Sequence, residues 1–582
     1  MHVVATAGHV DHGKSTLVRA LTGMEPDRWA EERRRGLTID LGFAWTELPG
    51  GQTVAFVDVP GHERFVPNML AGVGPVPAVL LVVAADEGWM PQSAEHLDAL
   101  DALGVRHGLL VITRSDLMEP ELALADARQH LRGTGLAGMS AVCVSAATGA
   151  GLTELRSALA TMVAALPEPD ASADVRLWID RVFTVRGAGT VVTGTLAAGT
   201  LSAGQELELH GQRVRVRGLQ ALGLPREQVG AVARVAVNLR GVPRERLRRG
   251  DALLTPGKWR ATALLDVRLS GADMPAQAVL HLGSAAVPAR VRPLGNGSAR
   301  LTLERALPLR IGDRGVLRDP GSTHNALGVT VLDTMPAELT RRGAAAVRAE
   351  QLARLDGVAD GASELARRGL VRASELLAMG AAVPVKAPRR GDWLLDPATI
   401  SGRADELVAA VREHAAKHPL DPGMPLEAAR QAVRLPDARL LEILLAEPAA
   451  AGLTAADGRL CDGIRDLPAT VRSAIERVRC QLDRNPFAAP EAHQLTDLGL
   501  GTAQLGAAVR SGQLLRVADG VYLLPDALPR AVALLAELPQ PFTLSQARQA
   551  LGTTRRVAVP LLERLAREGR TRRDEDGNHE VR

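Results

Sequence analysis

One octapeptide near the N-terminus, Gly8 to Ser15, restricts the fold of this chain more than any other feature. It reads Gly-His-Val-Asp-His-Gly-Lys-Ser, which fits the pattern of Gly, four residues, Gly-Lys and a hydroxyl residue. Residues 2–6 predict a strand and residues 16–21 predict a helix, which is the setting that a phosphate-binding loop requires. Such a loop turns backbone N–H groups and a helix N-terminus toward an anion. The sequence therefore predicts an α/β nucleotide-binding domain.

Further residues supply the partners of a triphosphate. Lys14 would reach the β- and γ-phosphates, and the Ser15 hydroxyl would join a Mg²⁺ shell. Thr38 offers a second hydroxyl ligand, and Asp58, at the end of an apolar strand, would hold the metal through water. The N–H of Gly61 would contact the γ-phosphate. Segments that a triphosphate orders and hydrolysis releases are the switches of GTPases.

The base is predicted to be guanine. A third predicted strand ends in Thr113-Arg114-Ser115-Asp116, and the Asp116 carboxylate would accept both guanine N1–H and N2–H₂. GTPases usually carry Asn-Lys-x-Asp at this position. Here Thr113 replaces the Asn and keeps a donor, and Arg114 replaces the Lys with a stem that would still cover the purine face. A backbone N–H after a fourth strand would meet guanine O6. The expected nucleotide-binding residues are Asp11, His12, Gly13, Lys14, Ser15, Thr16, Gly61, Thr113, Arg114, Asp116, Ser145 and Ala146.

Residues 7–14 and 58–63 resemble the elongation factor Tu signature of the translational GTPases. The resemblance implies that His62 is the catalytic residue that orients the attacking water. Positioning and electrostatics do most of the work in phosphoryl transfer. The resemblance also implies that Val10 and Leu37 form an apolar gate that keeps His62 away until a partner displaces it. We therefore expect slow intrinsic hydrolysis of GTP.

Composition narrows the remaining classes. A chain of 582 residues predicts several domains, and its net charge of +3 does not by itself indicate nucleic acid. Three scattered cysteines without a CxxC pair argue against structural zinc and disulfides, and fit a reducing cytoplasm. No window approaches the roughly 18 uninterrupted apolar residues of a membrane span. We expect a cytoplasmic monomer that does not contact a membrane.

The pattern along the chain changes twice. Alternating strands and helices give way to short β-rich runs, and these to Ala/Leu/Arg-rich helices with recurring Gly-turn hairpins at Gly391, Gly458, Gly520 and Gly577. Helices followed by a hairpin predict winged helices; a helical solenoid is the alternative, which the hairpins disfavour. The predicted multidomain fold has an α/β P-loop GTPase domain (1–172), two β-barrels (173–256, 257–340) and four tandem winged helices (341–402, 403–466, 467–525, 526–582).

The last predicted winged helix concentrates positive charge. Between residues 541 and 573 there are eight arginines against two glutamates. Arg555 and Arg556 begin the predicted recognition helix, and Arg572 and Arg573 lie on the first strand of the wing. Together they predict an RNA-binding face that contacts phosphates. A merely solvated charged face is the alternative.

The combination of a Tu-like GTPase, two barrels and tandem winged helices resembles the bacterial selenocysteine-specific elongation factors. The resemblance implies GTP/GDP and Mg²⁺ as cofactors. It implies delivery of selenocysteinyl-tRNA to the ribosome at recoded UGA codons. It also implies that the last winged helix binds an mRNA hairpin, the SECIS element, and that GTP hydrolysis on the ribosome releases the charged tRNA.

Substrate choice has a physical basis. A selenol is more acidic than a thiol, whose pKa is about 8.5, so it is largely an anion at neutral pH. A cationic pocket would therefore discriminate it from serine and cysteine. The resemblance places Arg181 and Arg234 in such an aminoacyl pocket, with Asp180 orienting one of them and Phe43 adding an apolar wall.

Two other readings stay open. The first is a different Tu-like GTPase, either a general aminoacyl-tRNA carrier or the GTPase of sulfate activation, and neither explains a long winged-helix tail. The second is a DNA-binding regulator switched by nucleotide. The set of Thr38, Gly61 and His62 and the pair of barrels argue against that regulator.

Overall fold

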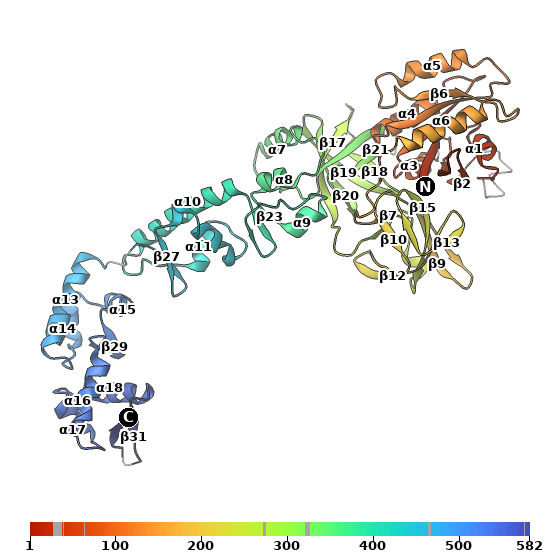
Figure 1. Ribbon diagram of the computed structural model, residues 1–582. Helices are drawn as coiled ribbons and strands as arrows, with labels where there is room; N and C mark the ends of the chain where they lie inside the picture. Colours follow the sequence, from red (N-terminus) through yellow and green to blue (C-terminus); the bar gives the residue numbers. More distant parts are fainter. Residues whose placement is uncertain are drawn as a thin grey trace. The chain divides into compact units, whose positions relative to one another are not determined.

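The structure is a computed structural model that divides into two compact units (Figure 1). One comprises residues 1–367 and 371–385, and the other residues 368–370 and 386–582. The residues described are 1–26, 38, 40–62, 65–271, 275–319, 326–463, 467–575 and 577–582. Within these ranges, no helix is both long and apolar enough to cross a membrane.

A six-stranded sheet with the order β2-β3-β1-β4-β5-β6 forms the N-terminal domain. All neighbouring strands are parallel except the edge strand β2. The strands are β1 (His2–Ala7), β2 (Gly42–Glu47), β3 (Thr53–Asp58), β4 (Ala78–Ala84), β5 (His107–Thr113) and β6 (Ser140–Cys143). The helices are α1 (Lys14–Thr22), α3 (Val66–Val73), α4 (Pro91–Ala102), α5 (Glu121–Leu131) and α6 (Leu152–Ala164).

The sheet is buried on both faces, as a parallel sheet requires. All seven residues of β4 are buried. Alternate residues belong to two cores, Val79 and Leu81 to the one under α3, α4 and α5, and Leu80 and Val82 to the one under α1 and α6. The carboxyl ends of the parallel strands therefore meet at one edge, where ligands of such sheets bind.

Two β domains follow. The first is a sheet with the order β7-β16-β11-β12-β15-β9-β8, with β13 beside β12 and β10 paired to β14. Its strands are β7 (Arg176–Trp178), β8 (Arg181–Val185), β9 (Gly189–Leu196), β10 (Thr200–Ser202), β11 (Glu206–Leu209), β12 (Gln212–Ala221), β13 (Leu224–Arg226), β14 (Gln228–Gly230), β15 (Ala233–Arg240) and β16 (Ala252–Leu254), with a 3₁₀ turn η2 (Arg244–Arg246).

The second β domain is a closed barrel of six strands, in the order β17-β20-β19-β18-β21-β22. Buried and exposed residues alternate along β19, which fits a strand with one face in a core. The strands are β17 (Ala261–Ser270), β18 (Gln277–Leu282), β19 (Ala285–Gly295), β20 (Ser298–Pro308), β21 (Arg314–Arg318) and β22 (Ala326–Asp333).

Three helices after the barrel belong wholly or mostly to the first unit: α7 (Ala344–Ala353), α8 (Gly361–Arg368) and α9 (Ala373–Ala378). A buried ion network fixes α7 to the barrel. Arg348 donates to Asp266 at 2.7 Å and to Asp333 at 2.6 Å, and both carboxylates are fully buried. Ala349 and Leu352 pack against Leu294 and Leu332 of the barrel. The segment predicted to open the first winged helix is therefore anchored to the barrel.

The second unit contains helices and short hairpins. It begins with β24 (Arg389–Arg390) and β25 (Trp393–Leu395), while β23 (Leu370–Arg372) lies where the two units meet in sequence. Next come α10 (Pro397–Lys417), β26 (Met424–Pro425), α11 (Leu426–Ala432), η3 (Ala438–Leu440), α12 (Leu441–Leu445), η4 (Pro448–Ala450), β27 (Leu453–Ala456) and β28 (Arg459–Asp462). The last part has α13 (Ala469–Arg484), α14 (Ala492–Asp497), α15 (Thr502–Arg510), β29 (Leu515–Ala518), β30 (Val521–Leu523), α16 (Ala527–Ala536), α17 (Leu544–Ala550), α18 (Arg555–Arg567), β31 (Thr571–Arg573) and β32 (His579–Val581).

The four glycine turns predicted from the sequence each lie between two antiparallel strands, so the hairpins are confirmed. The division into four winged helices stays a prediction. One hydrophobic core runs from Leu467 through α13–α15 to Leu565 in α18. The two last predicted winged helices therefore share a core across residue 525.

Candidate functional site

The phosphate-binding loop leaves β1 through a glycine that the packing requires. Gly8 has φ +131°, and a Cβ there would lie 2.2 Å from the carbonyl oxygen of Val82 in β4. The loop ends at Gly13, which is left-handed and precedes α1. Lys14 extends back along the loop, and its Nζ donates to the carbonyls of Gly8 at 3.0 Å and His9 at 2.6 Å. The predicted strand, loop and helix are confirmed.

Two side chains of α4 support this loop from behind. Gly8 N donates to His96 Nδ1 at 3.0 Å, and Val10 N donates to Gln92 Oε1 at 2.9 Å. Burial lowers the pKa of His96 to about 3, so its ring is neutral and Nδ1 is free to accept. Sequence reasoning missed both residues because they lie more than 80 positions away and match no motif.

The predicted nucleotide-binding residues in and directly after the loop differ in the exposure of their side chains. Asp11 and Thr16 are exposed. The His12 side chain is fully buried, and its Nδ1 lies 3.3 Å from the carbonyl oxygen of Val82. Burial lowers the pKa of His12 to about 4. His12 therefore faces the sheet as a neutral ring, and its backbone is what remains for a phosphate.

The three predicted metal ligands converge. Ser15 Oγ lies 2.9 Å from Thr38 Oγ1 and donates to Asp58 Oδ2 at 2.6 Å. Asp58 is fully buried, and its other oxygen accepts from Thr6 Oγ1 at 2.7 Å. Two hydroxyls and one carboxylate are hard oxygen donors, and they fit Mg²⁺, which keeps the rest of its shell as water. Thr6 was not predicted, since a threonine inside an apolar strand gives no signal of its own.

The segment after β3 lies against the phosphate-binding loop. A Cβ on Gly61 would meet both Lys14 Nζ and Val10 N at 2.6 Å, so only glycine fits this approach. His62 follows it, half-buried, with its ring centroid 6.0 Å from that of Phe65. Val10 is half-buried. Its predicted partner Leu37 lies outside the described residues, and the gate stays a prediction.

The guanine motif is tied to the phosphate-binding loop. Thr113 Oγ1 donates to the carbonyl of His12 at 2.8 Å. Arg114 donates to the carbonyl of Asp11 and pairs with Glu87 at 2.7 Å. Thr113 and Arg114, which stand where GTPases usually carry Asn and Lys, therefore both contact the backbone of the phosphate-binding loop. They hold the base side of the site and its phosphate side together.

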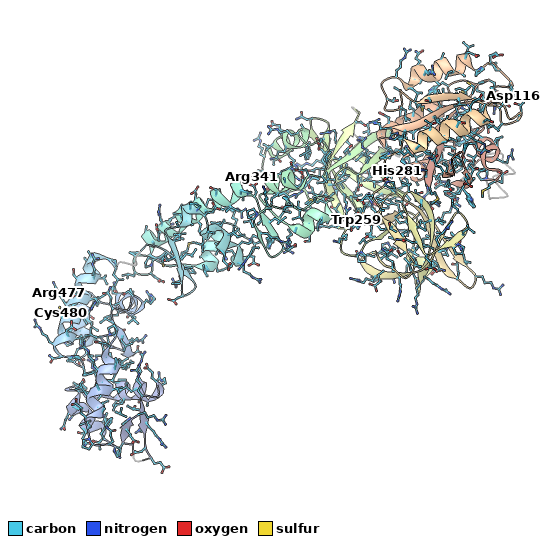
Figure 2. The ribbon with its side chains drawn as sticks, viewed as in Figure 1. Asp116, Trp259, His281, Arg341, Arg477 and Cys480 are labelled. Carbon is cyan, nitrogen blue, oxygen red and sulfur yellow. The ribbon has the colours of Figure 1, made fainter. Side chains whose placement is uncertain are left out.

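Asp116 and the turn after β6 complete the predicted base site. Asp116 is exposed in the turn that follows β5 (Figure 2). Ser145 is fully buried, and its Oγ accepts from Thr148 N at 3.1 Å, which fixes the turn that carries Ala146. Both turns lie at the carboxyl edge of the sheet, as the prediction requires.

A cavity of about 210 Å³ lies where the N-terminal domain meets the first β domain. Phe43 of β2 lines it together with Arg181 of β8 and Arg234 of β15. The guanidinium carbons of Arg234 and Arg181 lie 3.9 Å and 5.0 Å from the centroid of the Phe43 ring. The structure therefore brings the predicted pocket residues together from two domains.

Each pocket arginine has an acidic partner. Arg234 donates to both oxygens of Asp180, one of them at 2.7 Å, and to Thr193 Oγ1 at 3.1 Å. Arg181 Nε donates to Asp40 Oδ2 at 3.0 Å. The predicted role of Asp180 in orienting an arginine thus has the expected geometry. Thr193 and Asp40 were not predicted.

A third arginine lies near Asp40, the partner of Arg181. Arg249 Nη1 donates to Asn68 Oδ1 at 2.6 Å and lies 4.0 Å from Asp40 Oδ1. Burial lowers the pKa of Arg249, while Asp40 and Asp180 act in the opposite direction. Three arginines against two aspartates leave one excess positive charge around the cavity. No sequence pattern pointed to Arg249.

The four predicted RNA-binding arginines divide into two kinds. Arg555 is exposed at the first residue of α18, and Arg572 and Arg573 are exposed on β31. Arg556 is half-buried. Three of the four therefore remain accessible to a ligand.

The side chain of Arg556 is hydrogen-bonded to neighbouring segments of the same unit. Its Nη2 donates to the carbonyl of Ala489 at 2.7 Å, and its Nη1 to the carbonyl of Gly520 at 3.0 Å. It also pairs with Glu491 at 3.2 Å. These contacts give Arg556 a packing role between the last two predicted winged helices.

Family models match four parts of the chain. Residues 1–165 match the elongation factor Tu GTP binding domain, and residues 189–254 match elongation factor Tu domain 2. Residues 274–338 match the selenocysteine-specific elongation factor beta-barrel domain, and residues 533–579 match the elongation factor SelB winged helix.

Three curated relatives share the description selenocysteine-specific elongation factor. The protein of Desulfomicrobium baculatum is 39% identical over 58% of this chain and 57% of its own length. That of Escherichia coli K12 is 37% identical over 64% and 62%. That of Haemophilus influenzae is 33% identical over 72% and 70%. The chain thus spans less than two thirds of the first two relatives and more of the third.

Similar solved structures include selenocysteine-specific elongation factors as well. A bacterial selenocysteine-specific elongation factor, EF-Sec, is similar over 100% of both chains, with a TM-score of 0.74 and 25% identity. The elongation factor SelB of Methanococcus maripaludis, solved with the GTP analogue GPPNHP, covers 58% of this chain and 79% of its own, with a TM-score of 0.52 and 26% identity.

Proposed function

Because the chain belongs to the family of selenocysteine-specific elongation factors, we propose that it delivers selenocysteinyl-tRNA to the ribosome at recoded UGA codons. The observation that carries this proposal is the pocket in which Arg181 and Arg234 lie against the ring of Phe43. It is built from the GTP-binding domain and the adjoining β domain together. A nucleotide bound to the GTP-binding domain is therefore in a position to influence an aminoacyl group in the pocket.

GTP hydrolysis is the second part of the proposal. Lys14 would neutralise the β- and γ-phosphates. Ser15 and Thr38, with Asp58 through water, would hold Mg²⁺, which would offset charge on the phosphate oxygens. His62 orients the attacking water once a partner brings it toward the γ-phosphate. Hydrolysis to GDP and phosphate is then slow in the free protein and stimulated by the ribosome.

Charge selects the aminoacyl group. The selenolate of selenocysteine is an anion at neutral pH, whereas the hydroxyl of serine is not. A partly desolvated cation attracts an anion more strongly than one in water does, and the Arg234 side chain is 13% exposed. The excess positive charge of the cluster thus favours the selenocysteinyl form of the tRNA.

The C-terminal part of the second unit binds the message. We propose that Arg555, Arg572 and Arg573 contact phosphates of the mRNA hairpin, the SECIS element, so that delivery occurs at that site. Support comes from their exposure and from the SelB winged-helix match over residues 533–579.

Binding of one tRNA in its selenocysteinyl, cysteinyl and seryl forms tests the proposal. The protein is loaded with a GTP analogue, and wild type is compared with Arg181→Ala and with Arg226→Ala, an exposed arginine of the same β domain. We expect the selenocysteinyl form to bind best. We expect Arg181→Ala to lose roughly 10–100-fold for that form alone, as for one charged hydrogen bond. Equal binding of all three forms by wild type would contradict the proposal.

A further inference from the structure

One short segment touches both sites of the first unit. Thr38 Oγ1 lies 2.9 Å from Ser15 Oγ in the metal-binding set. Two residues later, Asp40 Oδ2 accepts from Arg181 Nε at 3.0 Å and lies 2.9 Å from Arg181 Nη2. Two residues only two positions apart in the sequence therefore contact the predicted Mg²⁺ ligands and the aminoacyl pocket, respectively.

Arg181 depends on that segment for its orientation. Its Nη2 also donates to the carbonyl of Leu41, the residue before β2. Among the described residues, the hydrogen bonds of the Arg181 side chain thus go to residues 40 and 41 of the GTP-binding domain, although Arg181 itself belongs to the β domain. These contacts hold the guanidinium 5.0 Å from the Phe43 ring.

Arg234 is held in a different way. Its partners Asp180 and Thr193 lie in the β domain itself, and Thr193 Oγ1 donates in turn to Asp180 Oδ1 at 2.8 Å. The hydrogen-bond partners of Arg234 therefore do not depend on the GTP-binding domain, although its guanidinium also lies against Phe43 of that domain. The hydrogen-bond partners of the two pocket arginines therefore belong to different domains, those of Arg181 to the GTP-binding domain and those of Arg234 to the β domain.

We propose that Asp40 is a positioning residue that makes the affinity of the aminoacyl pocket depend on the bound nucleotide. With Mg²⁺ and GTP bound, Thr38 would be held at the metal, and Asp40 would then be placed to hold Arg181 over Phe43. Without the γ-phosphate, that support is withdrawn and Arg234 alone faces the aminoacyl group. This inference rests on the proposed function and adds to it the residue that transmits the nucleotide state.

Asp40 is negatively charged, so it cannot itself attract a selenolate. Its role is therefore to orient Arg181. The side chains of Asp40 and Arg181 are 27% and 21% exposed, so the pair adds little to stability. A planar guanidinium that is hydrogen-bonded to one carboxylate has a fixed orientation. We expect this orientation to direct the remaining N–H groups of Arg181 toward the selenolate. Coupling between two sites is reciprocal, so selenocysteinyl-tRNA should also tighten the binding of the GTP analogue by the same factor.

The test compares the two nucleotide states. Affinity for selenocysteinyl-tRNA is measured with a saturating GTP analogue and with GDP, for wild type, Asp40→Ala, Asp40→Asn and Thr193→Val. We expect Asp40→Ala to lose about tenfold in the GTP-analogue state alone, within the usual range of coupling. Asp40→Asn should recover part of this loss, because its amide oxygen still accepts from Arg181. Thr193→Val, on the side of Arg234, should weaken both states equally.

Reciprocity gives a second readout. Selenocysteinyl-tRNA should slow dissociation of the GTP analogue from wild type, and should slow it less for Asp40→Ala. An unchanged ratio of the two affinities in Asp40→Ala would overturn the inference, as would an equal loss in both states. If wild type fails to distinguish selenocysteinyl- from seryl-tRNA, the proposed function fails instead, whatever the Asp40 variants do.

Discussion

Lys14 illustrates how burial changes the chemistry of one side chain. Burial lowers the pKa of Lys14 to about 8, although Asp58 and Asp11 favour its charged form. Without nucleotide, Lys14 therefore gives up its proton near pH 8, and a bound triphosphate must restore it. We predict that affinity for GTP falls above pH 8, by up to about tenfold per pH unit. Measuring the dissociation constant from pH 7 to 9 checks this.

The control for Lys14 is Lys14→Arg, because a guanidinium stays charged throughout that range. Its pH dependence reports only the nucleotide and the rest of the site. An identical slope for the two proteins would show that Lys14 does not titrate there.

The close packing around Gly61 predicts the effect of adding a methyl group at this position. A Cβ would lie 2.6 Å from both Lys14 Nζ and Val10 N, so Gly61→Ala must displace the loop or the lysine. Overpacking of this kind costs about 1–3 kcal/mol, and we expect affinity for a GTP analogue to fall roughly 5–150-fold. Gly218→Ala is the matched control, since nothing lies within 4 Å of its added Cβ. Unchanged affinity in Gly61→Ala would contradict the packing described.

At the level of helices, the contact between α7 and the barrel rests on Arg348. Arg300 and Arg348 share the buried Asp266, and Arg348 and Arg367 share the buried Asp333. Removing Arg348 leaves each buried carboxylate with one arginine instead of two, and losing a partner of a buried ion pair costs up to about 3–5 kcal/mol. We predict that Arg348→Ala loses hydrogen-exchange protection in α7.

Arg354 provides the comparison for Arg348, because it is the exposed residue that follows α7. Arg354→Ala should exchange like wild type. If Arg348→Ala also did so, the ion network would not be what anchors the helix.

The last helix and hairpin separate packing from recognition. Arg556 donates to the carbonyls of Ala489 and Gly520, whereas Arg572 is exposed. We predict that Arg556→Ala lowers the unfolding midpoint of the second unit, and that Arg572→Ala leaves the midpoint unchanged. Arg572→Ala should instead weaken binding of the mRNA hairpin and lower its salt slope by about one. Thermal unfolding and RNA titrations at several salt concentrations would distinguish them, and the reverse pattern would refute the assignment.

Across the chain, the sequence predicted what local patterns encode. The strand, loop and helix around Lys14, the edge of the sheet that gathers Asp58 and Asp116, and the four hairpins follow from short motifs and from turn chemistry. Long-range contacts leave no such trace. His96 behind the loop and Asp40 beside Arg181 are single polar residues whose partners lie 88 and 141 positions away.

Domain borders also depend on long-range contacts. The helices after residue 340 were predicted to begin a winged helix, but a buried ion network fixes α7 to the barrel, and charged residues on a helix do not reveal their partners. The common core of the last two predicted winged helices was likewise invisible, since apolar periodicity shows which face is buried but not against what.

Dipeptide formation on ribosomes programmed with a UGA codon tests the proposed delivery most directly. The reaction contains this protein, GTP and selenocysteinyl-tRNA, with a message that carries or lacks the hairpin. We predict a selenocysteine dipeptide that requires the protein, GTP and the hairpin, and little product when the same tRNA carries serine. No dipeptide, or equal yields from the selenocysteinyl and seryl forms, would contradict the account.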